Sequence, residues 1–458
     1  MKRSIIMILW LTLVLVLFGC GDNSETSMKK KMEKEGPVKV ESEKNSEDKT
    51  KEITIVINGT RMMGPDKILL PIDDYTKSFQ SKNNVKVTYD VIRSTSYEDY
   101  MKKLNTRLYE DNGPTLICFS GYVSPSSYID KGVALDVSNK ISNLKNIYSG
   151  LKKEKMFYVP IGMYKNGTIL NREVLKSLDI KEPTVNWTKK GYLNIKKKWL
   201  KERPREFNTI EYGDIVVGPL MNLDIIDIDN KKVSLNNNRV KNYLNTARSK
   251  IFSGDYKLKE DYNYYYKMIF EAGSEEYLEQ VDKYMNDPDD FLKLTESPNI
   301  LRLVDRQLKN DKYLILPNVD QSTVKTFGFM INKKGEDIEL GLKYINGLLN
   351  NKNQRDIYHN RSGLSYYPVN EKIEGEILKW DKEKGTDNRA IKLRKVVLDE
   401  LRNKKVDYLG MDKKMELMYY DIEKDLFSLI FTDKKYNEEE LEKELTKLEG
   451  KYNIIINE

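Results

Sequence analysis

The stretch Ile53–Ile57 reads Ile-Thr-Ile-Val-Ile and ends at the turn signal Asn58-Gly59. Because β-branched side chains pack well on a pleated surface, this run predicts a buried strand. Two further runs of strand character follow at 85–89 (Val-Lys-Val-Thr-Tyr) and 116–119 (Leu-Ile-Cys-Phe), and the segments between the runs carry apolar residues at helical spacing. Strands that alternate with helices in this way predict the α/β class, with a doubly wound, mainly parallel sheet.

Ligands of such a sheet bind beyond the carboxyl ends of its strands. The first predicted strand is followed there by Arg61, and the third by Ser120 and Tyr122. Neither turn contains a glycine-rich phosphate-binding loop, which argues against a nucleotide-binding fold. We therefore expect these three residues to lie near a bound solute.

The first 19 residues have the pattern of a secretion signal. Two basic residues open the chain, and the uncharged apolar stretch 5–18 that follows is too short to span a bilayer comfortably. Residues 17–20, Leu-Phe-Gly-Cys, resemble the lipobox of bacterial lipoproteins, in which the signal is cleaved before the cysteine and the cysteine is lipid-modified. They depart from it at Phe18, where a smaller residue is usual. The resemblance implies lipidation of Cys20; the alternative is an uncleaved N-terminal anchor helix.

The segment after Cys20, up to residue 51, is rich in charge and has almost no apolar side chains to bury. Such a composition predicts a flexible tether. A diacylated cysteine supplies more than one acyl chain for stable attachment. We expect a folded body from residue 52 onward, held at the extracytoplasmic face of the cell membrane by lipid.

Short motifs follow the third strand in a fixed order. They are Gly-Val-Ala-Leu-Asp at 132–136, Tyr-Val-Pro-Ile-Gly at 158–162, Pro-Thr-Val-Asn-Trp-Thr at 183–188, Phe-Gly-Phe-Met-Ile-Asn-Lys at 327–333 before an amphipathic helix, and Gly-Leu-Ser-Tyr-Tyr-Pro-Val at 363–369. In this order and spacing, most of residues 53–458 resembles the extracellular solute-binding proteins of bacterial ABC importers, of the sugar-binding type.

This resemblance implies a two-lobed fold in which a hinge joins two lobes, each a mainly parallel sheet flanked by helices. Lobe one would comprise residues 52–159 and 319–372, and lobe two would comprise 160–318 and 373–458. The implied function is capture of a small polar solute, an oligosaccharide or sugar, and its delivery to an ABC permease by a monomer that needs no cofactor. The alternative is a sensory or scaffolding receptor of the same fold that is not coupled to transport.

Strand ends, the hinge and the returning loop that begins at Gly363 should converge on the cleft between the lobes. Rings there can stack on the apolar face of a sugar, while polar side chains bind its hydroxyl groups. The predicted ligand-binding set is Arg61, Ser120, Tyr122, Tyr164, Asn166, Ser365 and Tyr366.

The composition argues against several other classes of protein. His359 is the only histidine, so multi-histidine metal sites are excluded and a catalytic triad would have to use this residue as its base. Lysines and acids are interspersed, which leaves no basic face for nucleic acid. Cys118 lies in an apolar run and is expected to be a buried small hydrophobe. The 71 acidic residues leave a glycosidase open as a third alternative, but no local motif indicates one.

The lipobox yields a direct prediction. Cys20→Ala should abolish the uptake of labelled lipid and prevent removal of residues 1–19, because the thiol that carries the lipid is lost. Labelling a bacterial host with a tagged fatty acid measures the first effect, and the apparent mass of the product measures the second. A wild-type protein that takes up no label would contradict the lipobox interpretation.

Overall fold

The computed structural model describes residues 51–59, 72–94, 97–110, 112–120, 124–202, 205–228, 230–271, 273–286, 299–301, 312–318, 324–359, 366–404, 406–409 and 413–457. The predicted signal, Cys20 and nearly all of the predicted tether lie outside these residues, as do three predicted ligand-binding residues, Arg61, Tyr122 and Ser365. Across the described ranges, no helix combines the length and the apolar character needed to cross a membrane.

A six-stranded sheet organises the first part of the fold, with the strand order β12-β4-β11-β3-β1-β2. Its strands are β1 (Glu52–Asn58), β2 (Lys86–Ile92), β3 (Leu116–Ser120), β4 (Tyr158–Tyr164), β11 (Lys325–Ile331) and β12 (Tyr367–Pro368). β1 pairs in parallel with β2 and with β3, while β11 runs antiparallel between β3 and β4. The three strands predicted from the sequence and the α/β class are confirmed.

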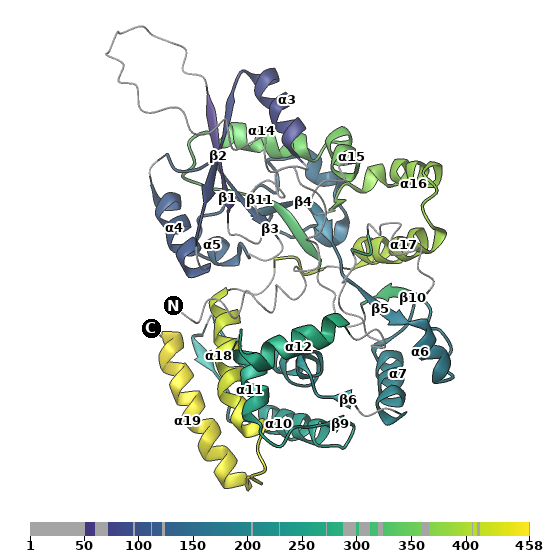
Figure 1. The fold of residues 1–458 in the computed structure, drawn as a ribbon. Coiled ribbons are helices and arrows are strands. Elements are labelled where there is room, and N and C mark those ends of the chain that lie inside the picture. The colour runs from purple at the N-terminus through teal and green to yellow at the C-terminus, as the bar shows by residue number, and fades with distance from the viewer. Residues whose placement is uncertain are drawn as a thin grey trace.

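Helices pack around this sheet (Figure 1). They are α3 (Asp73–Asn83), α4 (Tyr97–Tyr109), α5 (Ser126–Asp130), α14 (Ile338–Leu348), α15 (Asn351–His359), α16 (Glu374–Glu383) and α17 (Asn388–Asn403). Tyr344 of α14 joins two of them: its ring meets Phe79 of α3 edge-on at a centroid distance of 5.1 Å, and its hydroxyl shares a 2.7 Å hydrogen bond with Thr76. Apolar burial and a satisfied polar pair therefore fix α3 against α14.

The second part of the fold is built mainly of helices. They are α6 (Arg172–Ser177), α7 (Lys189–Glu202), α8 (Thr209–Tyr212), α9 (Gly218–Met221), α10 (Asn238–Ile251), α11 (Asn263–Phe270), α12 (Glu275–Asn286), α18 (Lys413–Ile430) and α19 (Glu438–Asn457), with a π-helical turn at Gly213–Val217 between α8 and α9. The strands are β5 (Gly167–Asn171) with β10 (Tyr313–Pro317), and the two-residue pairs β6 (Arg205–Glu206) with β9 (Tyr256–Lys257) and β7 (Ile226–Asp227) with β8 (Lys232–Val233). A mainly parallel sheet was expected here, whereas the described residues form only these two-stranded pairs.

Buried side chains fall into two hydrophobic clusters, which we call the first and the second cluster. The first contains the sheet, and the second contains α7, α10, α11, α18 and α19. The clusters divide the chain differently from the predicted lobes. β4 stays in the first cluster as far as Met163, although the predicted boundary after residue 159 assigned its later residues to lobe two. α17 packs in the first cluster through Leu393, Val397 and Leu401, although it too was assigned to lobe two. The reason is tertiary packing: the apolar face of α17 is buried in the first cluster. Figure 1 shows this helix between α16 and β10.

The chain passes between the clusters along β5 and β10, which Figure 1 shows between the two bodies. Ile315 of β10 packs against the first cluster, while its neighbours Leu314 and Leu316 pack in the second. This is the alternation of side chains expected of a strand, and here it gives each cluster one face of the same strand.

The centre of the sheet allows a stability test. A Cβ atom at Gly328 of β11 would collide with the carbonyl oxygen of Val159 and lie 2.8 Å from the Cα atom of Pro160. Gly328→Ala should therefore lower the free energy of unfolding by about 1–3 kcal/mol. Gly375→Ala in α16 is the matched control, because a Cβ atom there meets nothing within 4 Å; it should raise stability by up to about 1 kcal/mol. Urea melts of both variants measure the difference, and equal stability of the two would contradict the packing of β11.

Candidate functional site

One edge of the six-stranded sheet gathers the ends of several strands. Ser120 ends β3 and lies opposite Phe327 of β11, which in turn lies opposite Gly162 of β4. Because β1 and β3 are parallel and β11 is antiparallel to both β3 and β4, the carboxyl ends of β1, β3 and β4 lie at this same edge. We call it the carboxyl edge. The strand β4 leaves the sheet here and leads to β5 and the second cluster.

Several predicted ligand-binding residues meet at this edge. The backbone of Ser120 ends β3, Tyr164 ends β4, and Tyr366 directly precedes β12, whose residue Tyr367 lies opposite Met163. Asn166 follows Tyr164 at the passage to β5. The sequence-based prediction that these four residues lie close together is consistent with the register of the sheet; their contact with a solute stays a prediction.

The ring of Tyr366 is more deeply buried than the sequence suggested. It is 5% exposed and packs on Phe327 at a centroid distance of 4.6 Å within the first cluster. We expected a partly exposed ring, because the loop that begins at Gly363 was predicted to return to a cleft. The structure leaves little of this ring for stacking on a sugar. Tyr164 is half-buried and keeps more of its surface.

Lys165 lies in the short segment between β4 and β5, along which the chain passes between the clusters, and its contacts hold this segment in place. Its backbone nitrogen donates to Oδ1 of Asn299 at 3.2 Å, and its carbonyl oxygen accepts from the nitrogen of Ile300 at 2.9 Å. The side chain is 5% exposed, and its Nζ lies 3.7 Å from Oε2 of Glu400 on α17. Burial lowers the pKa of Lys165, and the carboxylate of Glu400 opposes that shift. No local sequence pattern indicates Lys165, since its partners are distant in the chain.

Asn166 has an unused acceptor. Its backbone forms an isolated antiparallel bridge with Asn299, and its side-chain Oδ1 is buried without a hydrogen-bond partner among the described residues. A buried acceptor of this kind costs free energy unless a donor reaches it.

Lys325 is a second residue at this edge that the sequence did not predict. It begins β11 directly opposite Tyr164 of β4, so the two side chains lie on the same face of the sheet. Burial lowers the pKa of Lys325. A register of this kind is set by strand pairing between residues 161 positions apart, which no local pattern reveals.

Trp187 has a structural role. Its indole Nε1 donates to the carbonyl oxygen of Pro317 at 2.7 Å, and its ring meets Tyr192 edge-on at 5.8 Å. The segment 183–188 is thereby pinned to the end of β10. Trp187 is therefore a packing residue.

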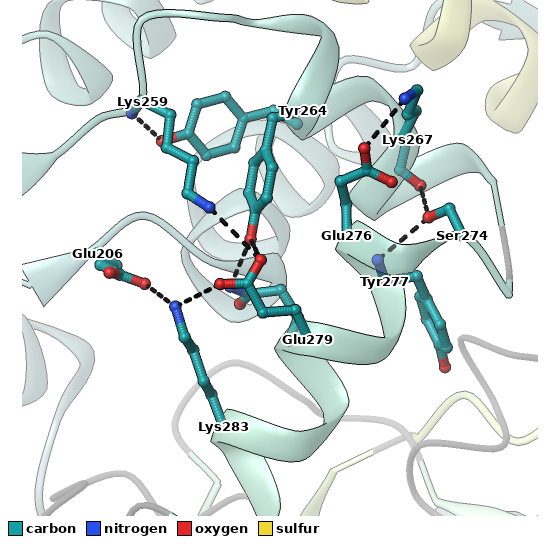
Figure 2. A network of polar contacts seen from close by, with 11 residues as sticks. Glu206, Lys259, Tyr264, Lys267, Ser274, Glu276, Tyr277, Glu279 and Lys283 are labelled. Carbon is teal, nitrogen blue, oxygen red and sulfur yellow. Dashed lines mark hydrogen bonds and ion pairs between the residues drawn. The ribbon is translucent and has the colours of Figure 1, made fainter.

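A polar network joins β6, α11 and α12 in the second cluster (Figure 2). The Tyr264 hydroxyl donates to Glu279 at 2.9 Å, and Lys283 bridges Glu279 and Glu206 at 2.8 and 2.7 Å. The hydrogen bond from Lys283 is the main cause that lowers the pKa of Glu279 to about 2. Because these charges are paired with one another at a partly exposed surface, the network fastens α11 to α12 and offers little for a solute.

The groups that could carry covalent or metal chemistry are few in the part of the chain that the structure describes. Cys118 is buried as predicted, and burial raises the pKa of its thiol to about 12, so it is inert at neutral pH. His359 ends α15 and stacks on Trp380 at a centroid distance of 4.7 Å. Within the described ranges, no three His, Cys, Asp or Glu residues are placed to hold a metal ion.

Solved structures of other proteins share this fold. Among curated proteins, none matches the sequence significantly. A putative oligosaccharide periplasmic-binding protein from Synechococcus sp. MITs9220 has a TM-score of 0.61 at 11% identity, with 88% of this chain and 99% of that chain covered. The cyclic alpha-maltosyl-1,6-maltose binding protein from Arthrobacter globiformis has a TM-score of 0.53 at 13% identity, with 89% and 99% covered. At these identities the likeness establishes the fold.

The sequence itself matches a family model. The model for bacterial extracellular solute-binding proteins matches residues 74–385, which is more than half of the chain. That span includes β2, β3, β4 and β11 and the passage between the clusters. The match confirms the resemblance drawn from the order of motifs. It also confirms the prediction that the chain is a solute-binding protein and not an enzyme. The chain belongs to the bacterial extracellular solute-binding protein family.

Proposed function

We propose that this protein captures an oligosaccharide or a similar small polar solute at the carboxyl edge and delivers it to an ABC permease in the membrane. The observation that carries the proposal is the meeting of Ser120, Tyr164 and Asn166 at the edge from which the chain passes to the second cluster. The Arthrobacter globiformis protein of the same fold is named for a cyclic maltosyl-maltose, which supports a carbohydrate as the solute.

The chemistry of the described residues suits such a solute. The half-buried ring of Tyr164 offers an apolar face for a pyranose. The unpaired Oδ1 of Asn166 is buried, and it would accept from a solute hydroxyl group once movement of the second cluster exposes it. Lys325, opposite Tyr164, adds a donor. The proposed set is completed by Arg61, Ser120, Tyr122, Ser365 and Tyr366. Movement of the second cluster about Lys165 and Asn166 would close the site, as hinge motions do in two-lobed binding proteins.

We further propose that Cys20 carries the lipid that holds the mature protein at the extracytoplasmic face of the cell membrane. The charged segment up to residue 51 would then let the folded body reach its membrane partner. The protein would act as a monomer without a cofactor.

Binding at the carboxyl edge can be tested by calorimetric titration with linear and cyclic maltooligosaccharides. Tyr164→Ala should weaken binding about tenfold, since a lost stacking face is worth about 1–2 kcal/mol. Asn166→Ala should weaken it by a similar factor because a buried hydrogen bond is lost. Tyr109→Ala is the matched control: this ring is 52% exposed at the end of α4, next to the start of β3 and so at the opposite edge.

Two outcomes would contradict the proposal. If the wild-type protein binds none of these saccharides, the proposed solute class is wrong. If it binds them and Tyr164→Ala and Asn166→Ala bind as tightly as Tyr109→Ala, the site lies elsewhere. Stimulation of a permease's ATPase by the loaded protein would separate transport from the sensory alternative.

The two tyrosines at the edge should respond differently to truncation. Tyr366→Ala removes a ring packed on Phe327 in the first cluster and should cost about 3–5 kcal/mol of unfolding free energy. Tyr164→Ala should cost less, because its ring is only half-buried. Thermal and urea melts of the two variants measure this contrast. Equal losses would contradict the difference in burial.

A further inference from the structure

One acidic side chain lies in the middle of the second cluster. Glu423 is on α18, directly after Ile422 and one turn before Leu426, and both of these neighbours are fully buried. Glu423 itself is 7% exposed. An acid at such a position needs a cation partner, or it must stay protonated.

No basic side chain of the described residues forms an ion pair with Glu423, and burial and the hydroxyl of Tyr212 alone act on its carboxyl group. Two lysines of the second cluster's helices have other partners. Lys196 of α7 lies 2.7 Å from both Glu211 and Asp214, and Lys424, the next residue on α18, lies over the ring of Tyr266 at 5.4 Å. Among the described residues, the carboxyl group is therefore buried without a compensating charge.

The titratable groups that face Glu423 are phenols. Tyr212 comes from α8, Tyr243 from α10, and Tyr420 from the preceding turn of α18. α11 contributes the apolar ring of Phe270, whose centroid lies 5.8 Å from that of Tyr420. Burial raises the pKa of all three phenols above the ordinary value, so they stay neutral at physiological pH.

The π-helical turn at Gly213–Val217 belongs to the same arrangement. It continues α8 directly after Tyr212, and the carbonyl oxygen of its residue Val216 accepts a 3.1 Å hydrogen bond from the hydroxyl of Tyr243. π-helical turns are rare and often occur where a helix has a functional constraint. Here the turn, α10 and α18 meet around Glu423.

We propose that Glu423 is a pH-sensitive switch in the second cluster: its neutral carboxylic acid is part of the packed core, and loss of its proton loosens α18 from α8, the π-helical turn and α10. An ionised carboxylate at this place has no cation to pair with among the described residues, so separation of the helices to admit water relieves its desolvation. The first cluster buries a carboxylate too, Asp381, but pairs it with Arg394.

The direction of the pH dependence follows from the two states of the carboxyl group. Burial raises the pKa of Glu423 from its ordinary value of 4.5 to about 8, and the hydroxyl of Tyr212 opposes this shift. Between these values the folded state holds a proton that the unfolded state has lost. The equilibrium constant for unfolding should therefore rise about tenfold for each unit of pH, and level off above the folded pKa.

The test is a series of urea melts of the full-length chain at several pH values between about 5 and about 9. Glu423→Gln keeps the shape and neutrality of the acid, so it should lose this part of the pH dependence and be more stable than wild type at the alkaline end. Asp421→Asn is the matched control, because it removes an exposed carboxylate two residues away on the same helix and should follow the wild-type slope. A Glu423→Gln variant with the wild-type slope overturns the proposal.

A second measurement decides the case if Glu423→Gln does not fold. Hydrogen exchange of the wild-type chain, read by mass spectrometry and corrected for intrinsic rates, compares peptides of α18 with peptides of β11. The proposal expects protection of α18 to fall as pH rises while that of β11 holds. Equal loss of protection in both elements overturns it.

Discussion

The fold depends on the insertion of β11 between β3 and β4. β11 is the only strand of the six-stranded sheet that pairs with both of these neighbours, and from Thr326 onward it is buried throughout. The chain forms β4, runs through most of the second cluster, and then returns to supply β11. Without that return, β1, β2 and β3 would be separated from β4 and β12. The sheet of the first cluster thus closes only when the chain has passed through the second.

This requirement also shapes the carboxyl edge. β4 leaves the sheet there toward β5, and β11 enters it there from β10, so the passages between the clusters lie beside the strand ends that form the proposed site. Lys165 holds one passage through Asn299, Ile300 and Glu400. A solute bound at Tyr164 and Asn166 would touch the segments about which the clusters move. Binding and movement are therefore expected to be coupled.

The two clusters differ in whether their buried carboxylates are paired with a cation. In the first, Asp381 is paired with Arg394, and Tyr358 donates to the same carboxylate at 2.8 Å, so the polar groups satisfy one another. In the second, Glu211 is paired with Lys196, but Glu423 is buried beside the hydroxyl of Tyr212 and has no ion pair among the described residues. Removing one partner of a satisfied pair leaves an uncompensated charge, whereas an unpaired acid avoids the charge by keeping its proton.

Much of this protein was predictable from local pattern. The strands at 53–57, 85–89 and 116–119 were correct because β-branched runs have few other places to pack, and the order of short motifs identified the family. Other features depended on contacts between distant residues. Periodicity shows that α17 has an apolar face, but the partner of that face, the first cluster, is set by tertiary packing. The burial of Tyr366, the pairing of Lys165 with Glu400 and the isolation of Glu423 were decided in the same way, because burial and charge compensation depend on which elements meet in space.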